Sequence, residues 1–324
     1  MKPNRTGFAI AAFAALAAAP VAAEPRPIEM VVPGPATPLA GTLLQADAPQ
    51  APVVLIVPGS GPTDRDGNSP LGVAGSSYRL LAEALAAKGI SSARIDKRGM
   101  FGSKAAGSDP NRVRLDDYAA DVGSWAKALK ERTGRDCIWV AGHSEGGLVA
   151  LIAANNPDVC GIILIAAPGR KLDAIIREQI AANPANAPIM AETNAALDAL
   201  ARGKKVDVSA LHPALAQGLF NPAVQDFLID VFRRDPAELI AKVDKPVLIL
   251  LGLADLQVGR VDADRLKAAQ PLAELTLIDG MSHTLKQVIG EGRAANMATY
   301  TDASLPIDPT LVDAIAGFVH PRQQ

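Results

Sequence analysis

The sequence has no excess of charge of either sign, only two cysteines and only four histidines. Its 32 basic and 34 acidic side chains give a net charge of −2 over 324 residues. A nucleic-acid-binding surface or a polybasic membrane patch needs an excess of basic residues, so we expect neither kind of partner. The sequence also contains no metal-ligand cluster, no phosphate-binding loop and no dinucleotide fingerprint, so we expect no metal and no cofactor.

Internal repeats and heptad arrays are also missing, so a solenoid or a coiled coil is not expected. What the chain does have is apolar material. Hydrophobic residues make up 49% of it, which is enough for a substantial buried core and excludes a disordered chain.

The N-terminus has the three parts of a secretory signal peptide. Lys2 and Arg5 precede an apolar run over residues 7–19, and small residues ending in Ala23 follow. The run is shorter than the roughly 20 apolar residues that a membrane span needs, which favours a cleaved leader over an anchor. We predict a signal peptide over residues 1–23, cleavage near Ala23, and a periplasmic or secreted protein with no membrane span after cleavage.

From residue 28 onward, short apolar runs rich in β-branched residues alternate with segments of helical apolar spacing. This alternation is typical of an α/β fold in which helices cover a mostly parallel sheet. Eight strands are predicted, at Ile28–Val32, Leu39–Leu44, Val53–Val57, Ser91–Ile95, Cys137–Ala141, Gly161–Ala166, Val247–Gly252 and Glu274–Ile278. Helices are predicted at Tyr78–Ala87, Leu115–Lys130, Leu148–Asn155, Ala263–Ala269 and Pro309–Val319.

Between Arg170 and Val243 the alternation of strands and helices stops. Alanine-rich helical stretches interrupted by prolines and a glycine replace it. We predict a helical cap over residues 170–243, inserted between the sixth and seventh strands. The core of the domain is then divided into residues 24–169 and 244–324.

The strand predicted at Cys137–Ala141 runs into the sequence Gly-His-Ser-Glu-Gly, with Gly142 first, Ser144 in the middle and Gly146 last. This pattern between a strand and a helix predicts a nucleophile elbow. A sharp turn imposes strained backbone angles on the serine, and the two glycines remove side chains that would collide. The serine hydroxyl then lies at a helix N-terminus, where N–H groups stabilise negative charge. We predict that Ser144 is a nucleophile.

A serine hydroxyl needs a neighbouring base to take its proton, so a histidine must lie close to Ser144 in the fold. His320 lies at the C-terminus and His212 lies in the predicted cap. His143 adjoins the serine, but we expect its side chain to point away from the hydroxyl. His283 remains, in the loop after the last predicted strand, and is the predicted base.

The histidine in turn needs a carboxylate to fix its tautomer and to stabilise its charged form. Asp255 follows the strongly apolar strand Val247–Gly252, whereas the preceding strand ends without a carboxylate. We therefore predict that Asp255 is the third member, in the chain order Ser, Asp, His. Asp262, Asp264 and Asp279 are the alternatives.

Negative charge that develops on a substrate oxygen needs two N–H donors, which together form an oxyanion hole. The N–H of Glu145, directly after the nucleophile, is one. We expect the other from the glycine-rich loop over residues 58–68, where Ser60 is the first choice and Gly61 the alternative. The charged residues 64–66 of that loop are either plain surface charge or a local ion pair that holds its shape.

With these residues, the chain resembles the α/β hydrolases, in their esterase and serine-aminopeptidase-like branch, over nearly all of its mature length. Three segments carry the resemblance: Gly142–Gly146, the loop 58–68, and residues 96–103, which are similar to an Asp-x-Arg-Gly-x-Gly-x-Ser turn with one residue inserted. The loop 58–68 looks most like that of bacterial carboxylesterases, although Pro58 stands where many relatives have histidine. A proline at position 58 leaves the backbone N–H donor expected from this loop intact.

The resemblance implies the α/β-hydrolase fold, an eight-stranded, mostly parallel sheet flanked by helices. It also implies that the turn at 96–103 is structural rather than catalytic. In this fold the fifth and sixth strands are parallel neighbours. Cys137 is predicted to begin the fifth strand and Cys160 to precede the sixth, so both fall at the same edge of the sheet. In an oxidising compartment we predict a disulfide between them, the alternative being two buried free thiols.

The predicted chemistry is acyl transfer on a small ester substrate by a carboxylesterase-like serine hydrolase. A peptidase acting on small peptides is the alternative, and it would need an acidic or polar anchor for the peptide amine, for which Glu145 or Glu178 could serve. A catalytically silent binding protein with the same fold is a third possibility. The sequence does not specify an oligomeric state.

Overall fold

The computed structural model describes residue 1 and residues 26–320, apart from 49, 108, 110 and 111. The predicted signal peptide, from residue 2 on, therefore lies outside the described residues. Within the part of the chain that is described, no helix combines the length and the apolar character needed to cross a bilayer.

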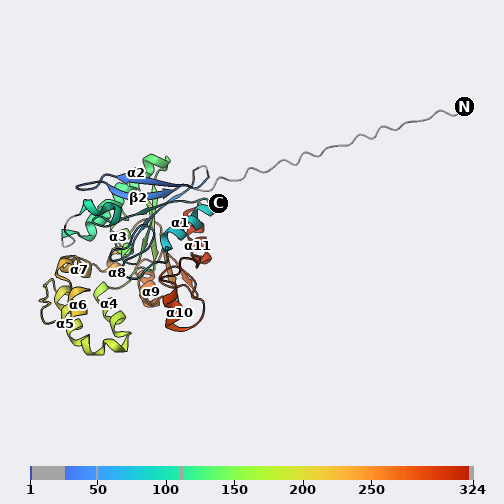
Figure 1. Cartoon of the computed structure of the whole chain (residues 1–324). Coiled ribbons are helices and arrows are strands. Elements are labelled where there is room, and N and C mark those ends of the chain that lie inside the picture. Colours follow the sequence, from blue (N-terminus) through green and yellow to red (C-terminus); the bar gives the residue numbers. More distant parts are fainter. Residues whose placement is uncertain (2–25, 49, 108, 110–111, 321–324) are drawn as a thin grey trace.

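A sheet forms the centre of the molecule (Figure 1). It has eight strands in the order β1-β2-β4-β3-β5-β6-β7-β8. β2 pairs antiparallel with both β1 and β4, and all other neighbours are parallel. The predicted fold class is thereby confirmed. The strands are β1 Pro27–Val32, β2 Leu39–Leu44, β3 Val53–Val57, β4 Ser91–Ile95, β5 Ile138–His143, β6 Val159–Ile165, β7 Val247–Gly252 and β8 Glu274–Ile278.

The central strands are continuous apolar runs because both faces of the sheet are covered. All five residues of β3, Val-Val-Leu-Ile-Val, are buried, and so are all six of β7. The edge strand β1 instead alternates between exposed and partly buried residues over most of its length. This is the pattern expected where a sheet changes from covered on both faces to covered on one.

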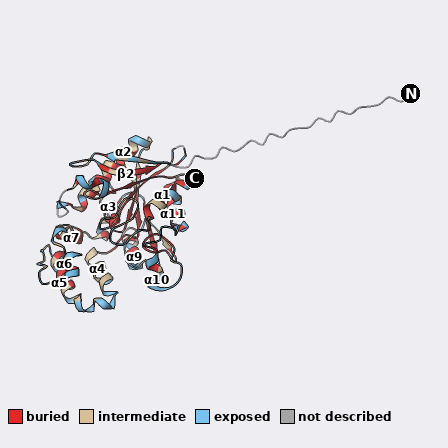
Figure 2. Cartoon of the chain, in the orientation of Figure 1, coloured by how far each residue is buried: buried red, intermediate tan, exposed pale blue. Residues whose placement is uncertain are grey.

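Helices on the two faces of the sheet build two hydrophobic clusters, visible as the buried interior in Figure 2. Helices α1 (Ser77–Ala87) and α11 (Pro309–Val319) contribute to one cluster and contact each other. Helices α2 (Leu115–Thr133), α3 (Glu145–Ala153) and α9 (Arg260–Ala269) contribute to the other. Short helices in this part of the molecule include η1 Phe101–Ala106 and α10 Gly292–Ala298.

The segment between β6 and β7 consists of short helices, and Figure 1 shows α4 to α7 gathered at one end of the molecule. Each of η3, α6, η4 and α8 has a proline in its first turn, so these prolines start helices. Buried residues such as Leu197 and Phe232 join this segment to the main core. The helices are α4 Leu172–Ala181, η3 Pro184–Ile189, α5 Met190–Ala201, α6 Pro213–Gln217, η4 Pro222–Val224, α7 Gln225–Phe232 and α8 Pro236–Ile240.

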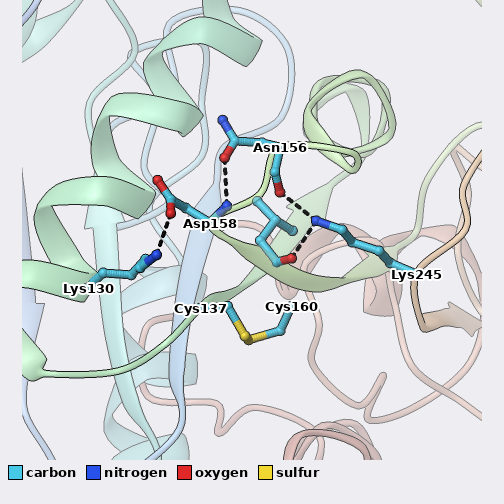
Figure 3. Close-up of a disulfide and its surroundings, with 7 residues drawn as sticks. Lys130, Cys137, Asn156, Asp158, Cys160 and Lys245 are labelled. Carbon is cyan, nitrogen blue, oxygen red and sulfur yellow. Dashed lines mark hydrogen bonds and ion pairs between the residues drawn. A yellow bond between two sulfur atoms is a disulfide. The ribbon is translucent and has the colours of Figure 1, made fainter.

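The structure contains a disulfide between Cys137 and Cys160, with their Cα atoms 5.1 Å apart (Figure 3). The two cysteines do not occupy the positions that the sequence predicts, because β5 begins one residue after Cys137 and β6 already contains Cys160. Ile138 pairs with Val159 and Trp139 pairs with Gly161, so Cys160 is the extra residue of a β-bulge. A bulge redirects a side chain, and here it accompanies the link between adjacent strands.

Candidate active site

Ser144 lies in the sharp turn between β5 and α3, with backbone angles φ 54° and ψ −123°. A positive φ is strained for any residue with a side chain, and such strain is typical of a nucleophile elbow. Both glycines are sterically required. A Cβ atom at Gly142 would lie 2.2 Å from the Gly146 carbonyl oxygen, and one at Gly146 would lie 2.4 Å from the carbonyl oxygen of Val57 on β3.

Asp255 and His283 meet at this end of the sheet, where the loops after β7 and β8 contact each other. The Oδ2 atom of Asp255 lies 2.7 Å from Nδ1 of His283. Oδ1 accepts hydrogen bonds from the N–H groups of Gln257 and Val258, at 2.7 and 3.0 Å. Burial raises the pKa of Asp255, but the His283 charge and these hydrogen bonds outweigh burial, so the pKa lies below its ordinary value. Asp255 is therefore held as a carboxylate against the imidazole.

Two contacts between the loops fix that pairing. The N–H of Ala254 donates to the Met281 carbonyl oxygen at 3.1 Å. A Cβ atom at Gly252 would lie only 2.0 Å from the same oxygen, so the approach of the loops depends on a glycine there. The loop that carries His283 is also tied to α1, since Ser77 Oγ donates to the Thr284 carbonyl oxygen at 2.8 Å.

Ser144 and His283 line one cavity of about 340 Å³. Among the described residues, no hydrogen bond joins Ser144 Oγ to His283 Nε2. In unliganded enzymes this contact is often long and tightens when substrate binds, so the arrangement is compatible with a nucleophile and its base.

His143 does not point into solvent but connects three parts of the site. Its Nε2 lies 2.9 Å from the His283 carbonyl oxygen, and its Nδ1 lies 2.8 Å from the Tyr78 hydroxyl. Burial, followed by the neighbouring His283 ring, lowers the pKa of His143 to about 3, so the ring is neutral. A carbonyl oxygen only accepts, so Nε2 carries the proton and Nδ1 accepts from Tyr78. The Tyr78 oxygen in turn accepts from the Gly59 N–H at 3.0 Å.

The loop after β3 lies against the nucleophile. A Cβ atom at Gly59 would be 3.2 Å from Ser144 Cβ, and both Gly59 and Ser60 line the cavity. Within the described part of the chain, no hydrogen bond uses the Ser60 N–H as donor. Glu145 is the first residue of α3, where N–H groups have no partner within the helix. Neither the Ser60 N–H nor the Glu145 N–H therefore has a hydrogen-bond partner among the described residues.

Charged residues of this loop pair with neighbouring strands rather than with one another. Arg65 contacts Asp96, after β4, at 2.8 Å and Glu29 of β1 at 2.7 Å. Asp66 forms an ion pair with Arg94 of β4. Asp64 turns the loop locally by accepting from the N–H groups of residues 66 and 68. Neither alternative given above describes these residues: Arg65 and Asp66 are paired, but their partners lie on or directly after strands of the sheet.

A buried ion pair joins Lys97, in the turn after β4, to the side chain of Glu145. Lys97 Nζ lies 3.7 Å from Glu145 Oε1, and the two side chains are 3% and 6% exposed. Lys97 Nζ also donates to the Gly59 carbonyl oxygen at 2.6 Å. Burial lowers the pKa of Lys97 and raises that of Glu145, and the attraction between the two groups offsets part of each shift.

The remaining histidines and carboxylates considered above lie in other surroundings. His212 caps the start of α6, where Nδ1 accepts from the Ala214 N–H, and His320 contacts the Lys88 carbonyl oxygen. Asp262 is bound by Arg170 at 2.9 Å, and Asp264 by Arg260 at 3.3 Å. The Asp279 carbonyl oxygen accepts from Gln287.

The contacts of three residues near the cavity are not predicted by the sequence: those of Tyr78, Lys97 and His143. The sequence places Tyr78 on a helix and Lys97 in a turn of presumed structural role. A tyrosine on an amphipathic helix and a lysine next to Arg98 look like core and surface residues. Only the fold shows that both reach the backbone of Gly59.

The residues that line the cavity are mostly uncharged types. Its described lining contains no Asp, Glu, Lys or Arg, and consists of small, hydroxyl, amide and apolar residues besides the two histidines. Gln257 and Tyr300 form part of the wall and are joined by a hydrogen bond of 3.0 Å. No group of three or more potential metal ligands occurs among the described residues.

Comparison with known proteins gives one family match and several relatives. A family model described as serine aminopeptidase, S33, matches residues 72–287. The chain is similar to esterase EstD of Thermotoga maritima, with 25% identity over 269 residues, which are 82% of this chain but only 61% of that protein.

Solved structures with a similar fold include both esterases and peptidases. Est1E from Butyrivibrio proteoclasticus aligns with 89% of this chain and 99% of its own, at 16% identity and a TM-score of 0.54. An acylaminoacyl peptidase from Pyrococcus horikoshii aligns with 93% of this chain and 43% of its own, at 15% identity and a TM-score of 0.56. At these identities the likeness concerns the fold alone.

Proposed function

The chain belongs to the serine aminopeptidase S33 family of α/β hydrolases, and from that membership we propose that it is a carboxylesterase that forms an acyl-enzyme on Ser144. The observation that carries the proposal is the hydrogen bond of 2.7 Å between Asp255 and His283 in a cavity that His283 shares with the strained Ser144. Such a set of side chains supports acyl transfer and has no evident use in a protein that only binds.

The proposed reaction has two halves. Ser144 Oγ attacks the ester carbonyl carbon while His283 Nε2 takes the hydroxyl proton, and the collapse of the tetrahedral intermediate passes that proton to the departing alcohol. Water then attacks the acyl-enzyme, gives a proton to His283, and releases the acid and the Ser144 hydroxyl. Asp255 keeps the His283 proton on Nδ1 and stabilises the charged imidazole.

The negative oxygen of each tetrahedral intermediate would be bound by the N–H groups of Ser60 and Glu145. Gly61 is a weaker candidate than Ser60 because its φ of 67° places it in the turn after the peptide that lies against Ser144. Removal of one such donor costs about 10²–10³-fold in turnover in serine hydrolases.

An ester suits this cavity better than a peptide with a free amino group. An aminopeptidase needs a carboxylate to hold the substrate's positive charge, and the described lining has none. Glu145 cannot serve because it is buried and paired with Lys97. Glu178 cannot serve in this conformation, because it is bound by Arg170 at 2.5 Å and does not line the cavity.

We also propose that residues 170–243 act as a cap. The contact that supports this is between α4 and the loop of the proposed acid, since Gln179 Nε2 donates to the Gln257 carbonyl oxygen at 2.9 Å. The described cavity lining contains no residue of this segment. The cap would therefore govern access through the loop after β7 rather than form the acyl pocket itself.

Export to the periplasm or the medium is the proposed location. The N-terminal sequence supports it, and the disulfide is compatible with it because such bonds persist in oxidising compartments. Sequencing of the mature N-terminus after expression in a bacterial host checks the cleavage near Ala23. Retention of the first 23 residues in exported protein would contradict it.

Two measurements test the proposed activity. A fluorophosphonate probe should label the wild-type protein at Ser144 and leave Ser144→Ala unlabelled, and a silent binding protein would not be labelled. Matched panels of aryl esters and aminoacyl anilides then compare kcat/KM, with neutral esters expected to be the better substrates. Faster cleavage of anilides with a free amine would instead identify a peptidase.

A further inference from the structure

Lys97 is a buried cation that the proposed reaction does not use. It comes from the turn directly after β4, and its side chain is 3% exposed. Burying an amine is costly unless its donors are satisfied. Here the nitrogen donates to the Gly59 carbonyl oxygen at 2.6 Å, lies 3.7 Å from the Glu145 carboxylate, and lies 5.5 Å from the centre of the Tyr118 ring.

The position of these partners connects Lys97 to the expected oxyanion donors. The Gly59 carbonyl belongs to the same peptide unit as the Ser60 N–H. In a trans peptide the C=O and N–H bonds point in opposite directions, and no cis peptide occurs among the described residues. A nitrogen that holds the carbonyl from the buried side therefore directs the Ser60 N–H the other way, toward the cavity that Ser60 lines.

We propose that Lys97 is a positioning residue of the oxyanion hole. It orients the peptide between Gly59 and Ser60 through the carbonyl oxygen and joins that peptide to Glu145, whose own N–H is the second donor. The inference rests on the proposed function and deepens it.

The backbone of Gly59 is held at both ends by side chains. Tyr78 accepts from its N–H at 3.0 Å, and Lys97 donates to its carbonyl at 2.6 Å. Preorganised donors stabilise an oxyanion without having to rotate during the reaction, so fixing this peptide before substrate arrives favours turnover. A hydrogen bond from an amine to the carbonyl also polarises the peptide and strengthens its N–H as a donor.

The protonation of the pair does not alter this geometry. Whether Lys97 and Glu145 are both charged or share the proton as a neutral pair, the lysine nitrogen keeps at least one hydrogen for the Gly59 carbonyl. If Lys97 only stabilised the fold, its loss would lower stability without a specific effect on the oxyanion. If Lys97 positions the Ser60 N–H, its loss must weaken binding of the substrate oxygen specifically when that oxygen carries negative charge.

The test compares Lys97→Met with Lys245→Met. Lys245 is a matched control because its nitrogen also donates to backbone carbonyls, those of Asn156 and Val159, but at the disulfide end of the sheet (Figure 3). With a neutral aryl ester, Lys97→Met should lower kcat by about 10²-fold while KM changes by less than about threefold. Lys245→Met should lower the melting temperature and leave kcat unchanged.

A pair of inhibitors isolates the oxyanion. An alkyl trifluoromethyl ketone accepts Ser144 Oγ at its carbonyl carbon, His283 takes the hydroxyl proton, and the ketone oxygen becomes an oxyanion. The matching methyl ketone binds largely without this addition. In Lys97→Met the Ki of the trifluoromethyl ketone should rise by about the factor lost from kcat/KM, whereas the Ki of the methyl ketone should stay unchanged.

Equal weakening of both ketones, or a kcat within about threefold of wild type, would overturn the inference. If Lys97→Met does not fold because Glu145 is left unpaired, Lys97→Met/Glu145→Gln removes the unpaired charge and should show the same kinetic losses. A crystal structure of the wild-type phosphonylated protein is an independent check. It should show the phosphoryl oxygen on the Ser60 and Glu145 N–H groups with Lys97 on the Gly59 carbonyl, and a Lys97 directed elsewhere would contradict the inference.

The same experiments separate this inference from the proposed function. A wild-type protein that neither reacts with a fluorophosphonate nor cleaves esters contradicts both. A wild-type protein that does both, beside a Lys97→Met variant with unchanged kcat and ketone affinities, contradicts only the role of Lys97.

Discussion

The two ends of the β5-α3-β6 unit are built from the same strands but differ in the interactions that hold them. At the carboxyl end, the strands lead into Ser144 and a set of buried polar groups that includes His143, Lys97 and Glu145. At the amino end, the strands are joined by the Cys137–Cys160 disulfide (Figure 3). The side chains of the nearby ion pair, Lys130 and Asp158, are 30% and 25% exposed.

Each end also has a cavity of about 340 Å³. The one at the amino end is lined by the disulfide, Trp139, Arg135 and the C-terminal end of α11, Val319 and His320. Its described lining contains no serine and no carboxylate beside the histidine. Volume alone therefore does not identify the site. Buried charges that hold backbone groups distinguish the carboxyl end, whereas a covalent link distinguishes the amino end. We infer that turnover depends on the first end and stability on the second.

The largest effect is expected from Ser144→Ala, which should change turnover at the carboxyl end without changing stability. Turnover should fall on the order of 10⁵- to 10⁶-fold, because the nucleophile is lost. The melting temperature should not fall, because the change removes one oxygen and no packing, and the strained φ of 54° is the same for both residues. Ester hydrolysis and thermal denaturation of the purified variant measure the two effects. Near-normal turnover would refute the nucleophile assignment.

The next largest effect tests the carboxylate behind His283. Asp255→Asn should lower turnover by about 10⁴-fold, since an amide favours the wrong histidine tautomer. Asp279→Asn is the control in the neighbouring loop and should have little effect. If Asp279→Asn were the damaging change and Asp255→Asn nearly silent, the acid would be Asp279.

Acid should lower the free energy of unfolding through groups at the carboxyl end, and it should do so before it affects the disulfide at the amino end. His143 has a pKa of about 3 in the folded protein against an ordinary value of 6.5. As the pH falls from about 6.5 to about 3, the unfolded chain binds a proton that the folded protein does not. The free energy of unfolding is therefore largest above about pH 6.5 and falls by at most about 5 kcal/mol toward pH 3. Asp255, with its lowered pKa, adds to the loss below its ordinary 3.8.

Urea unfolding between about pH 4 and pH 7 measures this dependence. The slope of unfolding free energy against pH should be smaller in His143→Gln, whose amide does not titrate but retains a donor for the His283 carbonyl. His212→Gln, at an exposed histidine, should keep the wild-type slope. Equal slopes in all three proteins would show that His143 does not contribute.

The smallest of these effects belongs to the amino end. Cys137→Ala/Cys160→Ala opens a link across a sequence separation of 23 and should cost about 3 kcal/mol in the chain-entropy model. Because the disulfide lies at the opposite end from Ser144, kcat should not change. Lys130→Met, at the same end, should cost less than about 1 kcal/mol. Alkylation of two free thiols in exported wild-type protein would contradict the bond, and a loss of kcat in the double variant would contradict the separation of the two ends.

Much of the sheet could be predicted from the sequence because its strands are uninterrupted apolar runs. Five of the eight strands have the predicted bounds, including Val53–Val57 and Val247–Gly252. The prediction ended β5 at Ala141, two residues early, because glycine and histidine are weak strand formers. In the fold the pairing with β6 continues to His143. Tertiary context overrides local preference there.

The helix after the nucleophile was placed too late for a related reason. Gly146 and Gly147 disfavour a helix, so the sequence predicts its start at Leu148, whereas α3 begins at Glu145. The fold needs glycine at 146 because β3 passes within contact distance of it. Helix α10, of seven residues, was missed because it is too short to show a helical apolar period.

Within the site, the sequence predicts the groups that follow strands and misses those that act on the backbone. Ser144, Asp255 and His283 each come after a strand in an order that can be read from the chain. The partners of Lys97 and Tyr78 are backbone atoms of Gly59, 38 and 19 positions away. No residue pattern reports a contact between a side chain and a distant carbonyl or N–H group.

The way in which Gly59 is held also bears on how this site could be moved by engineering. Neither hydrogen bond at Gly59 is part of a backbone ladder, and the charged residues of the same loop are bound by β4 and β1. Copying residues 58–68 alone into another hydrolase scaffold would therefore transfer the sequence of the loop without its conformation. A working graft would have to carry Tyr78 and the Arg94–Lys97 segment as well. The part of the molecule that has to be moved for the proposed oxyanion hole is therefore a set of three segments rather than one loop.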